Sequence, residues 1–135
     1  EYFKNKKNGH ISIVSSVAGY RGLPNAGAYC ASKSALNSFA ESLYFQLKPH
    51  NVGVSLVCPG FIKTPMTDQN DFPMPMIKSP EYAAEKIYDG IINKNSFEIH
   101  FPKSFTYLMK LLQLLPNWLY FGAINLGNKY MKRDK

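Results

Sequence analysis

The chain has 135 residues, of which 45% are hydrophobic, 14% aromatic and 19% charged, so its composition excludes a disordered chain and its length suits a single domain. The formal net charge is +7 at pH 7, but the basic residues concentrate at the two ends of the sequence. With no nucleic-acid-binding motif and no alternation of aromatic and basic residues, the sequence argues against a nucleic-acid partner.

The predicted elements alternate between strands and helices. They are, in chain order, a strand over residues 11–15, a helix over 26–48, a strand over 52–58, a helix over 79–93 and a strand over 96–101. The strands are short β-prone runs next to turn residues, and the helices carry apolar residues three and four positions apart. This order predicts an α/β fold in which helical crossovers join parallel strands.

The two predicted helices should each bury one apolar face. In the first helix this face comprises Leu36, Phe39, Ala40, Leu43 and Leu47. In the second helix it comprises Ala83, Ala84, Ile87 and Ile91. Ser79 should be the N-cap of the second helix, because Pro80 and Glu81 suit its first turn.

Two further apolar segments have a different character. Residues 61–78 are rich in Met, Phe and Pro with little periodicity, which predicts a mobile apolar loop. Residues 105–126 are strongly apolar, but the Pro116-Asn117 break favours two short helices over a membrane span. These helices pack against the domain or a partner subunit, or they associate with a membrane while the basic tail contacts anionic lipid.

Cysteine and histidine usage indicates neither a disulfide framework nor a metal site. The two cysteines, Cys30 and Cys58, have no CxxC spacing, which suits a reducing compartment. We therefore expect a cytoplasmic protein, and the alternative is a protein that associates with a membrane through residues 105–135. The three histidines are 40 and 50 residues apart and lack companion ligands at metal spacing, so we expect no metal.

Three polar side chains stand where they can share one carbonyl oxygen. Ser16 follows the first predicted strand, while Tyr29 and Lys33 lie on one face near the start of the next helix. This places all three at the carboxyl edge of the sheet, where open α/β folds bind ligands. An ammonium beside a phenol favours the phenolate, so Tyr29 could exchange a proton with an alcohol or carbonyl that Ser16 holds.

Three motifs at this edge resemble those of the short-chain dehydrogenase/reductase family. They are GHISIVSSVAG at residues 9–19, YCASKSAL at residues 29–36 and VCPGFIKT at residues 57–64. Ser16 precedes Tyr29 by 13 positions, the separation expected in this family, which assigns Ser16 rather than Ser15 as the catalytic serine. The resemblance implies the C-terminal part of a Rossmann-type, doubly wound parallel sheet, followed here by an apolar helical extension.

The resemblance also implies roles for individual residues. Tyr29 would be the general acid/base, and Lys33 would assist it and bind the ribose of a nicotinamide cofactor, NADP or NAD with a slight preference for NADP. Pro59 and Gly60 would shape the turn beside the nicotinamide. The remaining implied cofactor contacts are Tyr29 itself, Ile62 and Thr64.

The implied partners are a substrate and further copies of the chain. Residues 61–77 would form the substrate loop, whose apolar content suggests an apolar, lipid-like alcohol or ketone. A homo-oligomer is implied through the helix that begins near Ala26.

The family's glycine-rich phosphate loop and its catalytic Asn would lie before Glu1, so we expect a partial chain. Residues 1–102 would be the C-terminal half of an NAD(P)-binding domain, and residues 103–135 a helical extension with a basic tail. The leading interpretation is an alcohol/carbonyl oxidoreductase whose isolated half is inactive. The alternative is a non-enzymatic short chain that acts as an interaction or membrane-associated module through residues 105–135.

Overall fold

Three parallel strands form the sheet of the computed structural model, which describes the backbone of residues 1–70 and 72–133 and the side chains of residues 1–70 and 72–127. The strands are β1 (His10–Val14), β2 (Gly53–Pro59) and β3 (Glu98–Phe101), in the spatial order β1-β2-β3. Val57 of β2 lies opposite Val14 on one side and Ile99 on the other. The predicted α/β class and parallel sheet are confirmed, with strand bounds shifted by one or two residues.

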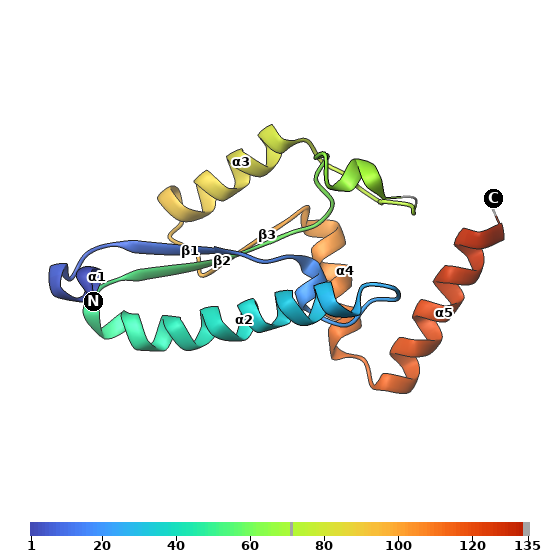
Figure 1. The fold of residues 1–135 in the computed structure, drawn as a ribbon, viewed down its shortest axis with the longest axis horizontal. Coiled ribbons are helices and arrows are strands. Elements are labelled where there is room, and N and C mark those ends of the chain that lie inside the picture. The colour runs from blue at the N-terminus through green and yellow to red at the C-terminus, as the bar shows by residue number, and fades with distance from the viewer. Residues whose placement is uncertain (71, 134–135) are drawn as a thin grey trace.

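The helices cover both faces of this sheet. They are α1 (Tyr2–Lys6), α2 (Gly27–Leu47), α3 (Pro80–Tyr88), α4 (Lys103–Leu114) and α5 (Asn117–Arg133). Figure 1 shows α2 along one face of the sheet and α3 along the other. A π-helical turn, Asp89–Asn93, follows the C-terminal end of α3. Ser79 is the N-cap of α3, as predicted, and its side chain accepts a hydrogen bond from the Tyr82 amide.

The core lies on the two sides of β2, the central strand. Because successive side chains of a strand point to opposite faces, Val57 packs with Ala83 and Phe101 on the α3 side. Leu56 and Cys58 pack with Ala40 on the α2 side. Both sides of β2 are therefore apolar and buried, as expected of an inner parallel strand.

Two residues predicted to be buried are exposed. The sheet-facing line of α2 runs through Cys30, Ala40 and Leu47, and Phe39, one helical step to the side, is 55% exposed. In α3 the buried position is Ala83, while Ala84 faces solvent. The apolar periodicity therefore located these helices correctly but made each buried face one residue too wide.

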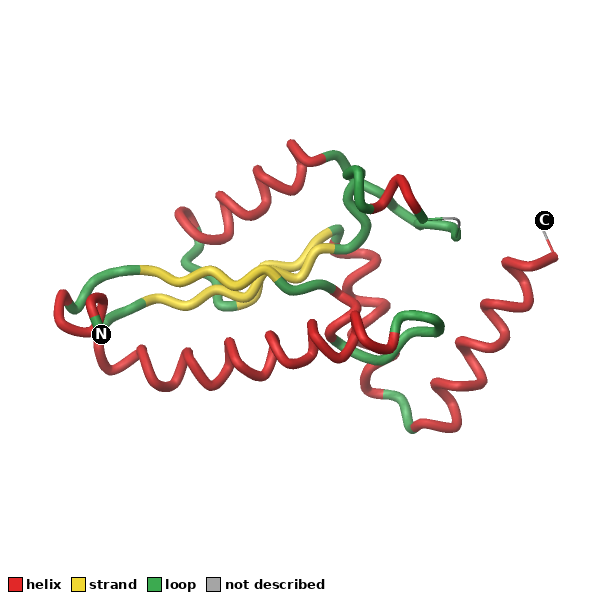
Figure 2. The backbone as a smooth tube through the Cα atoms, viewed as in Figure 1, coloured by secondary structure: helices red, strands yellow, loops and turns green. Residues whose placement is uncertain are grey.

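The two C-terminal helices meet at an elbow, Leu115–Pro116, where the prediction placed a break. Helix α4 returns toward β3 and buries Thr106 and Met109. Helix α5 stands apart from the sheet, as Figure 2 shows with the same view. No helix among the described residues is long and apolar enough to cross a membrane.

Candidate active site

Ser16 lies immediately beyond the carboxyl end of β1. The chain leaves the strand and enters a short 3-10 turn, Val17–Gly19, whose N-cap is Ser16. Its Oγ accepts a hydrogen bond from the Ala18 amide at 3.2 Å. Accepting this bond leaves the O–H hydrogen of Ser16 available to another acceptor, such as a substrate oxygen.

Tyr29 and Lys33 project from the first turns of α2. The Lys33 Nζ lies 5.6 Å from the centroid of the Tyr29 ring and donates a hydrogen bond to the Val14 carbonyl at 3.3 Å. Tyr29 is 45% exposed, so a ligand can reach its phenol. The ammonium of Lys33 thus joins the end of β1 to the aromatic ring on α2.

The segment after β1 is fastened to α2 at the level of Lys33. Buried Ser15 donates its hydroxyl to the Lys33 carbonyl at 3.0 Å, and Ser34 donates to the Gly19 carbonyl at 2.9 Å. A Cβ on Gly19 would lie 2.9 Å from the Lys33 carbonyl oxygen, so only glycine allows this close approach. These contacts place Ser16 and Lys33 on segments that cannot move independently.

Pro59 and Gly60 end β2 at the same edge of the sheet. The Gly60 amide donates to the Phe101 carbonyl at 2.8 Å, which continues the pairing of β2 with β3. A Cβ on Gly60 would lie 2.9 Å from the Phe105 ring and 3.2 Å from Pro102. The turn is therefore packed closely against the start of α4.

Ile62 and Thr64 lie in a compact turn after Gly60. Ile62 forms a parallel bridge with Lys78, made by the amides of Lys63 and Lys78. The amide of Ile62 therefore points away from Lys78. Thr64 is tied to Thr67: its amide donates to the Thr67 Oγ1 at 2.8 Å, and its own Oγ1 lies 3.3 Å from the same hydroxyl, so both groups of Thr64 have partners within the turn.

A second polar cluster, formed by Tyr20, Glu98 and Lys110, lies on the α2 side of the sheet. The Tyr20 hydroxyl donates to the Glu98 carboxylate at 2.6 Å, and the Lys110 ammonium pairs with the other Glu98 oxygen. Burial and the bond to Glu98 raise the pKa of Tyr20, so it stays a neutral donor. Burial also raises the pKa of the Cys58 thiol to about 11, which makes it an unreactive core residue.

Sequence reasoning located the site residues but missed those that hold them. It singled out neither the bond from Ser15 to Lys33 nor the Tyr20–Glu98–Lys110 cluster. Tyr20 and Glu98 are 78 positions apart, so no local pattern could pair them. In the described part of the chain, no three His, Cys, Asp or Glu side chains group closely enough to hold a metal ion.

Comparison with known proteins identifies the class to which this fold and site belong. A family model described as short chain dehydrogenase matches residues 1–73. An uncharacterized oxidoreductase of Myxococcus xanthus is 39% identical over 118 residues, which cover 87% of this chain and 46% of the relative. Epidermal retinol dehydrogenase 2 of Homo sapiens is 36% identical over 115 residues, 81% of this chain and 37% of the relative.

A solved structure has the same fold. The short chain dehydrogenase from Burkholderia cenocepacia in complex with NADP has a TM-score of 0.75 and 24% identity, covering 90% of this chain and 49% of that one. The chain belongs to the short-chain dehydrogenase family. The two relatives described above are named an oxidoreductase and a retinol dehydrogenase. The chain spans about half, or less, of the length of the curated relatives it matches.

Proposed function

We propose that this chain carries the proton-transfer site of an NAD(P)-dependent oxidoreductase that interconverts an alcohol and a carbonyl. The observation that supports it most is the placement of the Lys33 ammonium, 5.6 Å from the Tyr29 ring centroid and bonded to the Val14 carbonyl beside Ser16. In this proposal the Tyr29 hydroxyl exchanges a proton with the substrate oxygen, and the Ser16 hydroxyl donates a hydrogen bond to the same oxygen.

The proton and the hydride have separate sources in this reaction. A nicotinamide cofactor, when bound, supplies a hydride to the carbonyl carbon or takes one from the alcohol carbon. In reduction, the carbonyl oxygen takes the proton of the Tyr29 hydroxyl, and in oxidation the phenolate takes the alcohol proton. Lys33 offers ammonium hydrogens to ribose hydroxyls, and the turn at Pro59-Gly60 together with Ile62 and Thr64 is suited to hold the nicotinamide end.

The cofactor and substrate classes follow from the relatives and from the loop over residues 61–78. The Burkholderia cenocepacia dehydrogenase was solved in complex with NADP, so NADP is the first cofactor to test. Met66, Phe72 and Met76 of the loop are all exposed, and one relative is named a retinol dehydrogenase. We therefore propose a long apolar alcohol or ketone as the substrate.

A homo-oligomer is proposed through the outer face of α2. Phe39 and Phe45 lie on this helix and are largely exposed, which is costly for aromatic side chains in a lone protomer. The two rings lie about 120° apart around the helix, so a second copy would cover both only by packing over the broad outer side of α2 in a two-fold arrangement.

The experiment for the enzymatic proposal is Tyr29→Phe in the chain expressed with any in-frame coding sequence that precedes Glu1. Loss of the phenolic proton should lower kcat by about 10²–10⁴-fold while NADP binding stays within about twofold. Tyr88→Phe is the matched control, because Tyr88 is also exposed but lies on α3. Equal rates for the wild type and Tyr29→Phe would refute the role of Tyr29.

A second candidate function is an interaction or membrane-associated module that uses residues 105–135. It is favoured by the exposed apolar side chains of α4 and α5, among them Leu111, Leu114 and Trp118. This candidate needs no turnover. It predicts that removing residues 105–135 abolishes partner or membrane binding, which pull-down and vesicle sedimentation would measure.

A further inference from the structure

The elbow between α4 and α5 exposes a group of large apolar side chains. We name Leu111, Leu114, Trp118 and Leu119 the elbow patch. Leu114 is 81% exposed, the highest value among the large apolar side chains described, and Trp118 is 73% exposed. Such a concentration of exposed Leu and Trp marks an interaction surface rather than ordinary solvent-facing surface.

Arg21 fixes the elbow from the inner side. Its Nη1 donates to the carbonyls of Leu112 and Leu115 at 2.8 and 2.6 Å, and its Nη2 donates to the Asn117 Oδ1 at 2.6 Å. The last carbonyls of α4 therefore have partners, and the turn into α5 is set by a charged side chain. The elbow patch is held in place rather than left on a loose tail.

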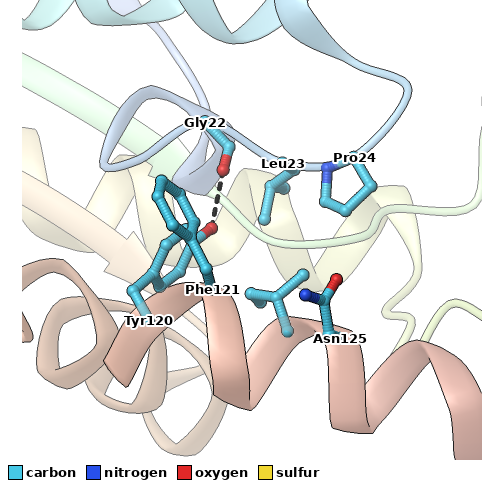
Figure 3. A pocket seen from close by; sticks show the side chains of 7 residues that line it. Gly22, Leu23, Pro24, Tyr120, Phe121 and Asn125 are labelled. Atoms are coloured by element: carbon cyan, nitrogen blue, oxygen red, sulfur yellow. Dashed lines mark hydrogen bonds between the residues drawn. The ribbon is translucent and has the colours of Figure 1, made fainter. Parts of the chain in front are cut away.

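Tyr120 provides a second attachment. Its hydroxyl donates to the Gly22 carbonyl at 2.6 Å, and the Arg21 guanidinium carbon lies 4.0 Å from the Tyr120 ring centroid. Figure 3 shows the Tyr120 hydroxyl bonded to Gly22. Both residues line a cavity of about 310 Å³, together with Leu23, Pro24 and Phe121. Tyr120 thus holds the inner side of α5 to the loop, whereas Trp118 remains exposed.

The charge around this segment is strongly positive. From Lys103 to Lys135 the sequence has six basic residues and one acidic residue, a net charge of +5 out of the +7 of the whole chain. Four of the six, at positions 129, 132, 133 and 135, follow the elbow patch, and their side chains lie outside the described part of the chain. Two such segments, brought together by a second copy of the chain, would repel each other because both are positively charged. An anionic surface would instead attract the segment.

The lengths of α4 and α5 favour association with the surface of a membrane over a membrane-spanning arrangement. Helix α4 has 12 residues and α5 has 17, both short of the ~20 that a membrane span needs. A segment with exposed Leu and Trp and a net positive charge is instead typical of segments that lie in the headgroup layer. Trp is also the side chain that settles most readily at this boundary.

We propose that the α4–α5 elbow docks on an anionic lipid surface, with Leu114 and Trp118 entering the headgroup boundary and the net positive charge of residues 103–135 favouring anionic lipid over neutral lipid. This inference goes beyond the oxidoreductase activity and does not depend on it. The contact is peripheral and reversible, because two or three inserted side chains and a few charges do not anchor a protein permanently. It should weaken as salt is added.

Trp118 is the single tryptophan of the sequence, so its emission reports on the elbow patch directly. Vesicles of phosphatidylcholine with phosphatidylserine should shift the emission to the blue and sediment the protein, and vesicles of phosphatidylcholine alone should do so at least about tenfold more weakly. No shift with the phosphatidylserine vesicles would overturn the proposal. A blue shift without lipid that grows with protein concentration, together with dimers in ultracentrifugation, would assign the patch to a second copy and also overturn it.

A matched pair of variants separates insertion from charge. Leu114→Glu and Gln113→Glu add the same charge to neighbouring exposed positions of α4, so folding should survive in both, as circular dichroism would verify. Leu114→Glu should lower vesicle affinity by at least about tenfold through the lost apolar contact, and Gln113→Glu by about threefold or less. Equal affinity of Leu114→Glu and Gln113→Glu would contradict insertion of the elbow patch.

Discussion

The sheet and the α4–α5 elbow are stabilised in different ways. In the sheet, β2 buries apolar side chains on both faces, and Val57 and Cys58 are fully enclosed. At the elbow, Leu114 and Trp118 face outward, and polar contacts make the attachment. The site residues therefore depend on a rigid apolar core, while the elbow can present an apolar surface because hydrogen bonds position it.

Polar contacts join these two regions, and three of them are informative. Arg21 binds the end of α4, Tyr120 binds the Gly22 carbonyl, and Lys110 of α4 pairs with Glu98 of β3. The first two start from the loop between Ser16 and Tyr29. The elbow is thus fastened to the same loop that links two of the proposed catalytic residues.

The sharpest contrast is expected in stability. Phe101 is almost fully buried between β2 and α3, so Phe101→Ala should lower the free energy of unfolding by about 3–5 kcal/mol. Leu111→Ala, at an exposed position of α4, should change it by about 0.5 kcal/mol or less. Urea unfolding of both variants measures the difference. A large loss for Leu111→Ala would show that the elbow patch is part of the core.

A smaller effect, with a pH signature, is expected at Glu98. Partial burial raises the pKa of this carboxyl, but hydrogen bonds from Lys110 and Tyr20 outweigh burial, and the pKa is lowered overall. A lowered folded-state pKa adds stability that is present above the unfolded value of about 4.3 and is lost as the pH falls through the folded value.

Glu98→Gln should therefore cost about 1.5–3 kcal/mol at neutral pH, the contribution of hydrogen bonds to a charged group. The gap to the wild type should narrow as the pH falls below about 4. Glu41→Gln, at an exposed position of α2, is the control in denaturant titrations at several pH values. A gap that stays constant from neutral to acid pH would show that the charge of Glu98 contributes nothing.

The smallest effect is expected at Tyr120. Tyr120→Phe removes the hydroxyl that donates to Gly22 and should cost about 1 kcal/mol. Hydrogen exchange should become faster in α5 near residue 120, while β2 keeps its protection. Tyr107→Phe, at an exposed position of α4, is the matched control. Equal exchange in both variants would mean that the Gly22 contact does not hold α5.

The sequence allowed the sheet to be predicted well because its signals are local. The residues that define a buried strand, a turn or the Ser79 cap are only a few positions apart. All three strands of the described residues and the two helices that cover the sheet, α2 and α3, were found. The width of a buried face is a tertiary property. Phe39 was misassigned because the crossing of α2 over β2, which selects Ala40, cannot be deduced from periodicity alone.

The site shows the same division. Spacing and motif placed Ser16, Tyr29 and Lys33 at one edge, and the structure brings Lys33 beside both the Tyr29 ring and the Val14 carbonyl. Arg21 gave no signal, because its partners lie 91 or more positions further along the chain. Contacts over such separations depend on the completed fold rather than on local pattern.

The most direct test of the proposed chemistry follows deuterium from the cofactor to the product. The chain, expressed with any in-frame coding sequence before Glu1, is given NADPH deuterated at its hydride position and a long apolar ketone, and the alcohol is analysed by mass spectrometry. We predict one deuterium on the carbinol carbon with the wild type and with Tyr88→Phe, and a loss of labelled product of about 10²–10⁴-fold with Tyr29→Phe. Equal labelled product from Tyr29→Phe would contradict the assignment of Tyr29 and Lys33 as the proton-transfer site, and alcohol formed without deuterium would contradict hydride transfer from the nicotinamide.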